Sequence, residues 1–242
     1  MIWLARPEIA RTRSGLVHER PRPAAATRSG LLGTGRPVPR WAVATALLTP
    51  VVMVAGWLIG GALQPTSYSP MRETISVLAG HSGTDSWVMT TALLVVGSCQ
   101  IATGAGLTAV RLPARILLIL TGLCMLGIAA SPEPPAGPTV RHLVFAVSCA
   151  ATAAIWPLLV ARRGQAQSWI LSVYGCATTT VLFAGLSCWL LIAAHGNGDV
   201  GMVERLTTTV LGSFPFVVAL ALRQTARGDA GPEVSQFDTI ES

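Results

Sequence analysis

Side chains able to do chemistry are few in this sequence, and they stand beside long apolar runs. Arginines next to acids near a membrane boundary suit the binding of an anionic group, because a guanidinium offers phosphate a planar fork of donors. A carboxylate or imidazole in low-dielectric surroundings suits acid–base catalysis. The candidates are Arg72, Glu73 and Ser76 in SPMRETISVLAG (residues 69–80), Arg141 and His142 in VRH, and Glu204 and Arg205 in GMVERL.

These seven residues form the predicted ligand-binding set, and the phosphate of an anionic lipid is the expected ligand. Some of them also have a purely structural explanation: a first-turn acid such as Glu204 is favoured by the helix dipole, and Arg72 can extend towards headgroups. Arg205 is different, because a cation in a first turn opposes the dipole and charges at membrane depth are usually paired. An ion pair of Arg205 with Glu73, or of Arg72 with Glu204, is the simplest hypothesis, either as a latch or as the floor of a site.

An enzyme is the alternative that these residue types leave open. Glu73 or Glu204 would act as general acid or base with His142 as partner, on a lipid or isoprenoid substrate. Known catalytic patterns are absent from the sequence: it has no Gly-rich phosphate loop, no HExxH and no GxSxG. Catalytic roles therefore rest on residue type and position alone.

The long apolar runs on either side of these residues are predicted to form membrane-spanning helices. A helix needs about 20 apolar residues to cross roughly 30 Å of hydrocarbon. Helices are expected because an open strand would leave backbone groups unpaired in lipid. The predicted fold is all-α, a six-helix transmembrane bundle, from apolar runs at 41–63, 87–110, 115–130, 141–161, 169–194 and 202–222.

A short amphipathic helix is predicted at 69–80, between the first and second spans. Ser69 suits an N-cap, Pro70 the first helical position and Gly80 the C-terminal stop. About ten helical residues extend only ~15 Å, so this helix should lie at the outer surface or in the mouth of the bundle.

The arginines predict the orientation and the domain organisation. All 17 basic residues are arginines, and fourteen of them fall in the tails and in alternate loops, which the positive-inside rule places in the cytoplasm. We therefore expect a multi-pass protein of a bacterial plasma membrane with both termini cytoplasmic. Residues 1–40 and 224–242 are predicted to be disordered tails around a membrane domain at 41–223, and an over-annotated start codon is an alternative for 1–40.

Composition argues against several other classes of function. Only 12% of the residues are charged, against about 25% in ordinary soluble domains, so the bilayer is the expected partner. The positive charge lies mostly in the N-terminal tail rather than on a folded surface with aromatics, so we do not expect nucleic-acid binding. The five cysteines lie in apolar runs without CxxC spacing, so no metal site, disulfide framework or other cofactor is predicted.

Several segments together resemble the DUF998 family, bacterial and mostly actinobacterial membrane proteins without an assigned function. They are SYSPMRETISVLAG, GTDSWVMTTALLVVGSC, VRH before the fourth span, WP near its inner end, and GMVERL, and the resemblance covers roughly residues 41–223. It implies six helices and a bacterial plasma membrane, and it supplies no reaction. In the family pattern a histidine is common where this chain has Gln100.

Three functions follow, in this order of preference. The first is a non-catalytic membrane protein that binds an anionic lipid headgroup at its outer face. The second is the membrane-embedded enzyme, and the third is a transport accessory protein. Transport is placed last because the predicted spans carry almost no ionisable residue at mid-depth, although a homo-oligomer that lines a path stays open as an alternative.

Overall fold

The computed structural model describes residues 38–162, 168–196 and 198–228, and the regular elements within them are helices joined by loops. Six of the helices are long and apolar enough to cross a membrane, which confirms the predicted fold class. The elements are α1 (Arg40–Ala62), α2 (Ile75–Leu78), α3 (Trp87–Gly106), α4 (Leu112–Ala129), α5 (Val140–Val160), the 3-10 helix η2 (Trp169–Leu171), α6 (Val173–His195) and α7 (Val200–Gly228).

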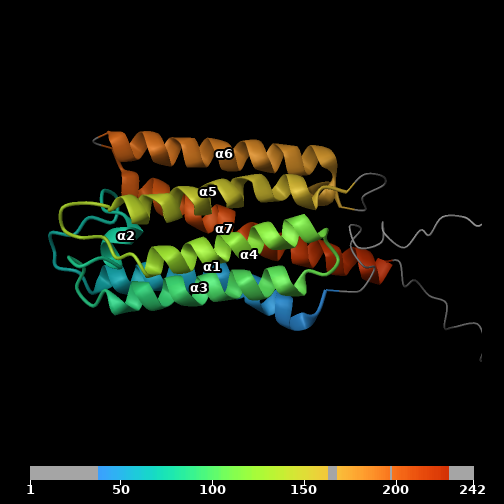
Figure 1. The fold of residues 1–242 in the computed structure, drawn as a ribbon, viewed down its shortest axis with the longest axis horizontal. Helices are drawn as coiled ribbons and strands as arrows, with labels where there is room; N and C mark the ends of the chain where they lie inside the picture. Colours follow the sequence, from blue (N-terminus) through green and yellow to red (C-terminus); the bar gives the residue numbers. More distant parts are fainter. Residues whose placement is uncertain (1–37, 163–167, 197, 229–242) are drawn as a thin grey trace, which may run out of the picture.

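The six long helices pack side by side in a ring. Each contacts the next along the chain, from α1 through α3, α4, α5 and α6 to α7, and α7 returns to α1. Figure 1 shows α2 and the loops around it gathered at one end of the bundle, here called the α2 end, while both ends of the described chain lie at the opposite end. A ring of this kind leaves an interior that every helix can line.

Some helices end before the predicted apolar run does, because polar groups satisfy the helix end there. The run predicted over 87–110 is helical only to Gly106, because Arg115 caps the end of α3. Its Nε donates to the Gly104 carbonyl oxygen at 3.1 Å, and its Nη2 donates to that of Ala105 at 2.7 Å. A cation at a helix C-terminus satisfies free carbonyls and complements the dipole.

The last two spans begin and end differently from their predicted limits. The run at 169–194 opens with η2, and α6 starts only after Ser172, whose Oγ accepts a hydrogen bond from the Gly175 amide at 3.0 Å. Helix α7 continues to Gly228, into the segment expected to be a tail. The remainder of both predicted tails, 1–37 and 229–242, lies outside the described residues.

Small residues bring α3 and α4 into close contact. A Cβ added at Gly122 would lie 2.6 Å from the Gly97 carbonyl oxygen, and one added at Gly97 would lie 2.8 Å from that of Gly122. Both distances are too short for a real Cβ, so the two helix backbones touch at this pair. Close approach through small residues is a common way to pack helices where no hydrophobic force acts between them.

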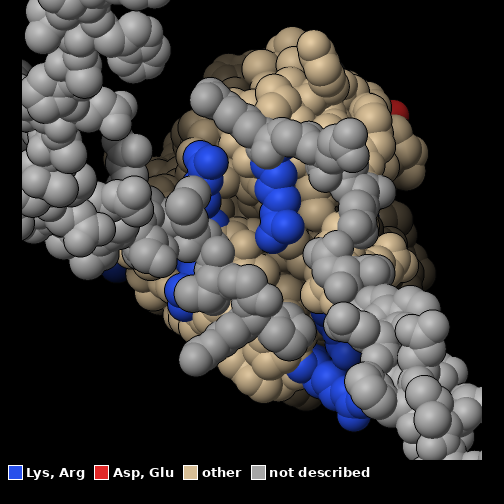
Figure 2. Space-filling model, turned by 90° about the vertical axis from the view of Figure 1, so that its right-hand side faces the viewer, with Lys and Arg blue, Asp and Glu red and all other residues tan. Residues whose placement is uncertain are grey.

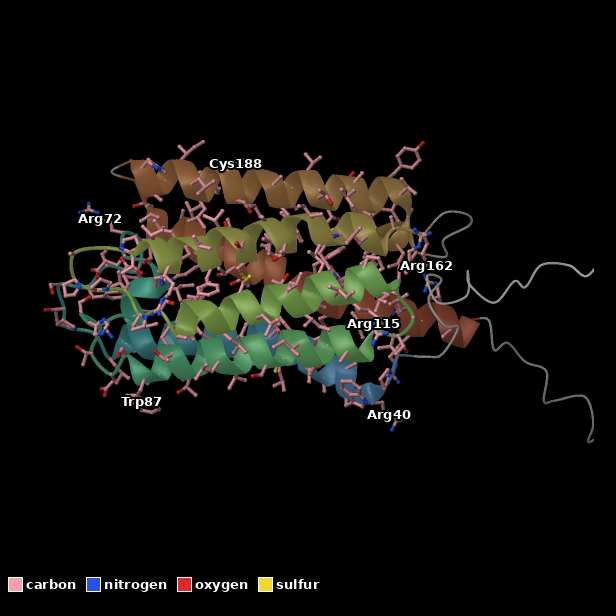
Figure 3. The ribbon with its side chains drawn as sticks, viewed as in Figure 1. Arg40, Arg72, Trp87, Arg115, Arg162 and Cys188 are labelled. Atoms are coloured by element: carbon pink, nitrogen blue, oxygen red, sulfur yellow. The ribbon has the colours of Figure 1, made fainter. Side chains whose placement is uncertain are left out.

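The two ends of the bundle differ in charge. Figure 2 shows arginine side chains around the end opposite α2, and Figure 3 labels Arg40, Arg115 and Arg162 there.

Helix α6 presents much of its length outward, with Tyr174 83%, Val181 72% and Ile192 72% exposed. These apolar side chains fit a lipid environment.

Replacing Gly122 by valine should destabilise the protein by about 1–3 kcal/mol, because the branched side chain must force α3 and α4 apart. Thermal unfolding of the purified protein in mild detergent measures the loss. The matched control is Gly185→Val in α6, where an added Cβ meets no atom within 4 Å. Equal stability of the two variants would contradict the tight α3–α4 contact.

Candidate functional site

Arg205 is the most heavily engaged charged residue at the α2 end. It lies in the second turn of α7 and is 7% exposed. Its Nη1 donates to three backbone carbonyl oxygens, those of Pro70 at 2.7 Å, Glu73 at 2.8 Å and Gly201 at 2.8 Å. Its Nη2 donates to the Tyr68 hydroxyl. The guanidinium thus ties residues 68–73 to α7.

The hypothesised Arg205–Glu73 contact therefore exists, but it is made by the Glu73 backbone rather than its carboxylate. The Glu73 carboxylate instead stabilises the turn in which it lies, since Oε1 accepts from the Ser69 amide at 3.0 Å. Among the described residues no ion pair joins Arg72 to Glu204 either: Arg72 is exposed, and the Glu204 carboxyl group accepts from a backbone amide of α2. The arginine acts as a latch on backbone oxygens.

The predicted helix at 69–80 is shorter than its sequence signals indicated. Helix α2 covers only Ile75–Leu78, and Thr74 is its N-cap, with Oγ1 accepting from the Val77 amide at 3.3 Å. A helix from Pro70 would have used the carbonyls of Pro70 and Glu73 for its own ladder. Arg205 takes both, so residues 69–73 form a turn instead.

Close approach of this turn to α7 depends on Gly201. A Cβ at that position would lie 2.2 Å from the Glu73 carbonyl oxygen and 2.6 Å from that of Pro70. The Met202 amide, one of the free amides in the first turn of α7, donates to the Met71 carbonyl oxygen at 3.1 Å. The turn and α7 therefore complete each other's backbone hydrogen bonds.

Two aromatic residues complete the surroundings of Arg205. Its guanidinium carbon lies 5.6 Å from the centroid of the Trp57 ring, within cation–π range. Burial raises the pKa of the Tyr68 hydroxyl above its ordinary value, although the Arg205 charge opposes the shift. Tyr68 therefore stays protonated at neutral pH. Sequence reasoning missed both aromatics, because neither stands beside a charge in the chain.

Glu204, one residue before Arg205, points its carboxylate to α2. Its Oε2 accepts from the Ile75 amide, a first-turn amide that no carbonyl within α2 can satisfy. Glu204 also lines the interior cavity described below. One turn of α7 thus holds the 68–73 turn through the Arg205 guanidinium and α2 through the Glu204 carboxyl group.

His142 joins α5 to α2 and to the loop that follows α4. It is 4% exposed, with Nδ1 2.8 Å from the Ser131 carbonyl oxygen and Nε2 3.0 Å from Ser76 Oγ. A carbonyl can only accept, so Nδ1 carries a proton. In the neutral imidazole Nε2 is then the acceptor, and the Ser76 hydroxyl donates to it.

An elongated cavity of about 120 Å³ lies inside the helix ring, beneath α2. Its lining on α7 runs from Glu204 to Gly212, eight residues or ~12 Å of helix. Most of the wall is apolar. Its lining residues are Thr49, Met53, Ile75, Ser76, Leu93, Val96, Gln100, Thr121, Met125, Ile128, Ala146, Cys149, Ala150, Ala153, Leu190, Glu204, Thr207, Thr208, Leu211 and Gly212.

Gln100 gives this cavity an unsatisfied polar atom. The residue is 6% exposed, and its Oε1 is buried without a hydrogen-bond partner among the described residues. A buried amide oxygen left unpaired costs about 1–3 kcal/mol, so a donor inside the cavity would stabilise the protein.

Arg72 and Arg141, the other two arginines of the predicted set, are exposed. Figure 3 shows Arg72 at the edge of the α2 end, pointing away from the helices. Arg141 donates through Nη2 to the Ala130 carbonyl oxygen at 3.0 Å. The structure thus brings Ser76, His142, Glu204 and the backbone of Glu73 close to one another around α2, and it leaves these two arginines at the surface.

Six helices that are each long and apolar enough to cross a membrane are the mark of an all-helical membrane protein. The sequence model of the family described as "protein of unknown function (DUF998)" matches residues 47–221, and the chain belongs to this family. No curated protein matches the sequence. No solved structure matches either.

Replacing Arg205 by methionine should destabilise the protein by at least about 2 kcal/mol, because carbonyls buried against the guanidinium lose their donor. Thermal unfolding in detergent gives the change. The matched control is Arg72→Met, which removes the same charge from an exposed position and should change stability little. Two variants of equal stability would contradict the latch.

Proposed function

We propose that this protein binds one lipid-like molecule in the cavity beneath α2. The observation that carries the proposal is the cavity itself, an apolar slot with a few polar atoms at defined points. Its volume of about 120 Å³ is far above the ~10–15 Å³ that one water requires. An apolar wall with few polar contacts is typical of small-molecule sites.

The polar atoms of the lining indicate what the ligand offers. Glu204 contributes a carboxyl group, which disfavours an anion beside it, and Gln100 contributes an amide oxygen without a partner among the described residues. Among the described residues that line the cavity there is no arginine, since Arg205 faces the backbone carbonyls of the 70–73 turn. The part of the ligand inside the cavity is therefore uncharged or cationic, with hydrogen-bond donors.

An anionic headgroup, the ligand expected from the sequence, has a different place in this proposal. Arg72 and Arg141 are exposed at the α2 end and are free to meet phosphates at the membrane surface. They would assist a lipid whose neutral part enters the bundle. The cavity determines specificity, and the surface arginines add electrostatic attraction.

The proposed location is a bacterial plasma membrane with the α2 end outside. The arginines at the opposite end, among them Arg40, Arg115 and Arg162, support a cytoplasmic position for that end by the positive-inside rule. The ligand would then come from the outer leaflet.

Filling the cavity should remove the ligand. In Gly212→Leu the new side chain enters the cavity, because a Cβ there has ordinary contact only, 3.6 Å from Thr49 Cγ2. We expect retention of the co-purifying lipid to fall about tenfold or more, equivalent to a loss of at least ~1.4 kcal/mol of binding. Native mass spectrometry of the detergent-purified protein measures the retained lipid.

The control is Gly185→Leu, the same change at an exposed position of α6 with no atom within 4 Å. It should retain lipid as the unaltered protein does. Equal retention by both variants would contradict cavity binding. Loss of lipid in Arg72→Ala together with full retention in Gly212→Leu would instead place the site at the surface arginines.

A further inference from the structure

We infer that Ser76 and His142 act as a nucleophile–base pair that cleaves an acyl ester of the bound lipid. The inference rests on the proposed function, since it takes the cavity as the lipid site. It assigns the protein an activity, ester hydrolysis, that lipid binding alone does not require. Five observations carry it.

The first observation is the distance and direction of the contact. Ser76 Oγ lies 3.0 Å from His142 Nε2, within the 2.6–3.2 Å range expected for a nucleophile and its base. The two residues come from different helices, 66 positions apart in the chain. Their pairing therefore depends on the tertiary fold and cannot result from local chain geometry.

The second observation is the tautomer of the imidazole. His142 Nδ1 lies 2.8 Å from the Ser131 carbonyl oxygen, which cannot donate. This contact holds the proton on Nδ1 and turns the basic Nε2 to Ser76. A third group that orients the base in this way is part of the general arrangement that activates a serine hydroxyl.

The third observation is where the two side chains face. Ser76 lines the cavity, while His142 is 4% exposed and lies behind it. A substrate in the cavity can therefore reach the hydroxyl, and bulk water reaches the imidazole poorly. A nucleophile at the wall of an apolar slot, with its base shielded, suits an ester that carries a hydrocarbon chain.

The fourth observation is the support given to the nucleophile. Glu204 holds the Ile75 amide, in the residue just before Ser76. Arg205 holds the turn that leads into α2. Glu204 and Arg205 are thus positioning residues for Ser76 and do not carry the reaction themselves.

The fifth observation concerns the alcohol part of the ester. Gln100 lines the cavity, and its Oε1 has no hydrogen-bond partner among the described residues, so a donor that reaches this oxygen would be bound. A free hydroxyl of a neutral lipid, or a water molecule that accompanies it, supplies one. The chemical class of substrate is therefore a neutral acyl ester with at least one hydroxyl group.

The reaction is balanced with water as the only co-reactant. Ser76 Oγ bonds to the acyl carbon as its proton passes to His142 Nε2, and the ester C–O bond breaks. The leaving alkoxide takes that proton and departs as an alcohol. Water then attacks the acyl-serine and gives a proton to His142, which returns it to Ser76 Oγ as the carboxylic acid leaves.

A long-chain alkyl fluorophosphonate tests the pair directly, because an activated serine displaces its fluoride and becomes phosphonylated. The full-length protein in mild detergent is incubated with the probe, and peptide mass spectrometry locates the adduct. We expect one adduct, on Ser76. If Ser76 of the unaltered protein carries no adduct, the inference is overturned. This test uses no variant, so it does not depend on whether a variant folds.

Two variants separate activation from mere accessibility. His142→Gln retains the Ser76 hydroxyl and should lower the labelling rate about a hundredfold or more, the usual contribution of a general base. The matched control is His195→Gln, the same change at an exposed position at the end of α6, which should label normally. Undiminished labelling of His142→Gln overturns the inference.

The outcomes also separate this inference from the proposed function. If the unaltered protein retains a lipid that Gly212→Leu loses, but Ser76 is not labelled, lipid binding is upheld and the esterase activity is overturned. Labelling of Ser76 that Gly212→Leu blocks and Gly185→Leu does not supports both.

Discussion

One buried guanidinium determines the structure of the α2 end. Arg205 lies near the start of a membrane-spanning helix, where its charge opposes the helix dipole, and removal of a cation from water is costly unless it is fully hydrogen-bonded. Three backbone carbonyls and the Tyr68 hydroxyl accept hydrogen bonds from Nη1 and Nη2, and the Trp57 ring lies within cation–π range, while Nε has no partner among the described residues. Because two of the carbonyls belong to residues 70–73, this segment must lie against α7 and cannot continue as a helix.

The interior site follows from that constraint. Once the turn is held, α2 begins at Ile75, its first amide meets Glu204, and Ser76 reaches His142 at the head of α5. Three segments distant in sequence thus meet above a cavity that the helix ring leaves open. An exposed basic patch alone would attract anionic lipids, whereas this arrangement suits a molecule that enters the bundle and presents donors to Glu204 and Gln100.

The sequence predicted the architecture well and the site only in part. Six apolar runs determine six helices because lipid leaves the backbone no other common solution. Residue types also singled out Glu204, Arg205, His142 and Ser76. Most of their contacts could not be predicted, because Arg205 and His142 bind backbone carbonyl oxygens, which every residue has whatever its type. The Arg205–Glu73 contact was expected between side chains, and it is made by the Glu73 backbone. The short α2 was mispredicted for the same reason: Ser69, Pro70 and Gly80 are correct local signals, but a side chain 135 residues away takes the Pro70 carbonyl.

Hydrogen–deuterium exchange of the peptides that cover residues 69–78 and 200–204 measures whether Arg205 orders the segment leading into α2. In the unaltered protein, the amides of Ile75 and Met202 should exchange slowly, because Glu204 and the Met71 carbonyl hold them. In Arg205→Gln both peptides should exchange at rates near those of an open loop, while peptides from the middle of α3 stay protected. Slow exchange that persists in Arg205→Gln, or fast exchange in the unaltered protein, would show that Arg205 does not order this segment.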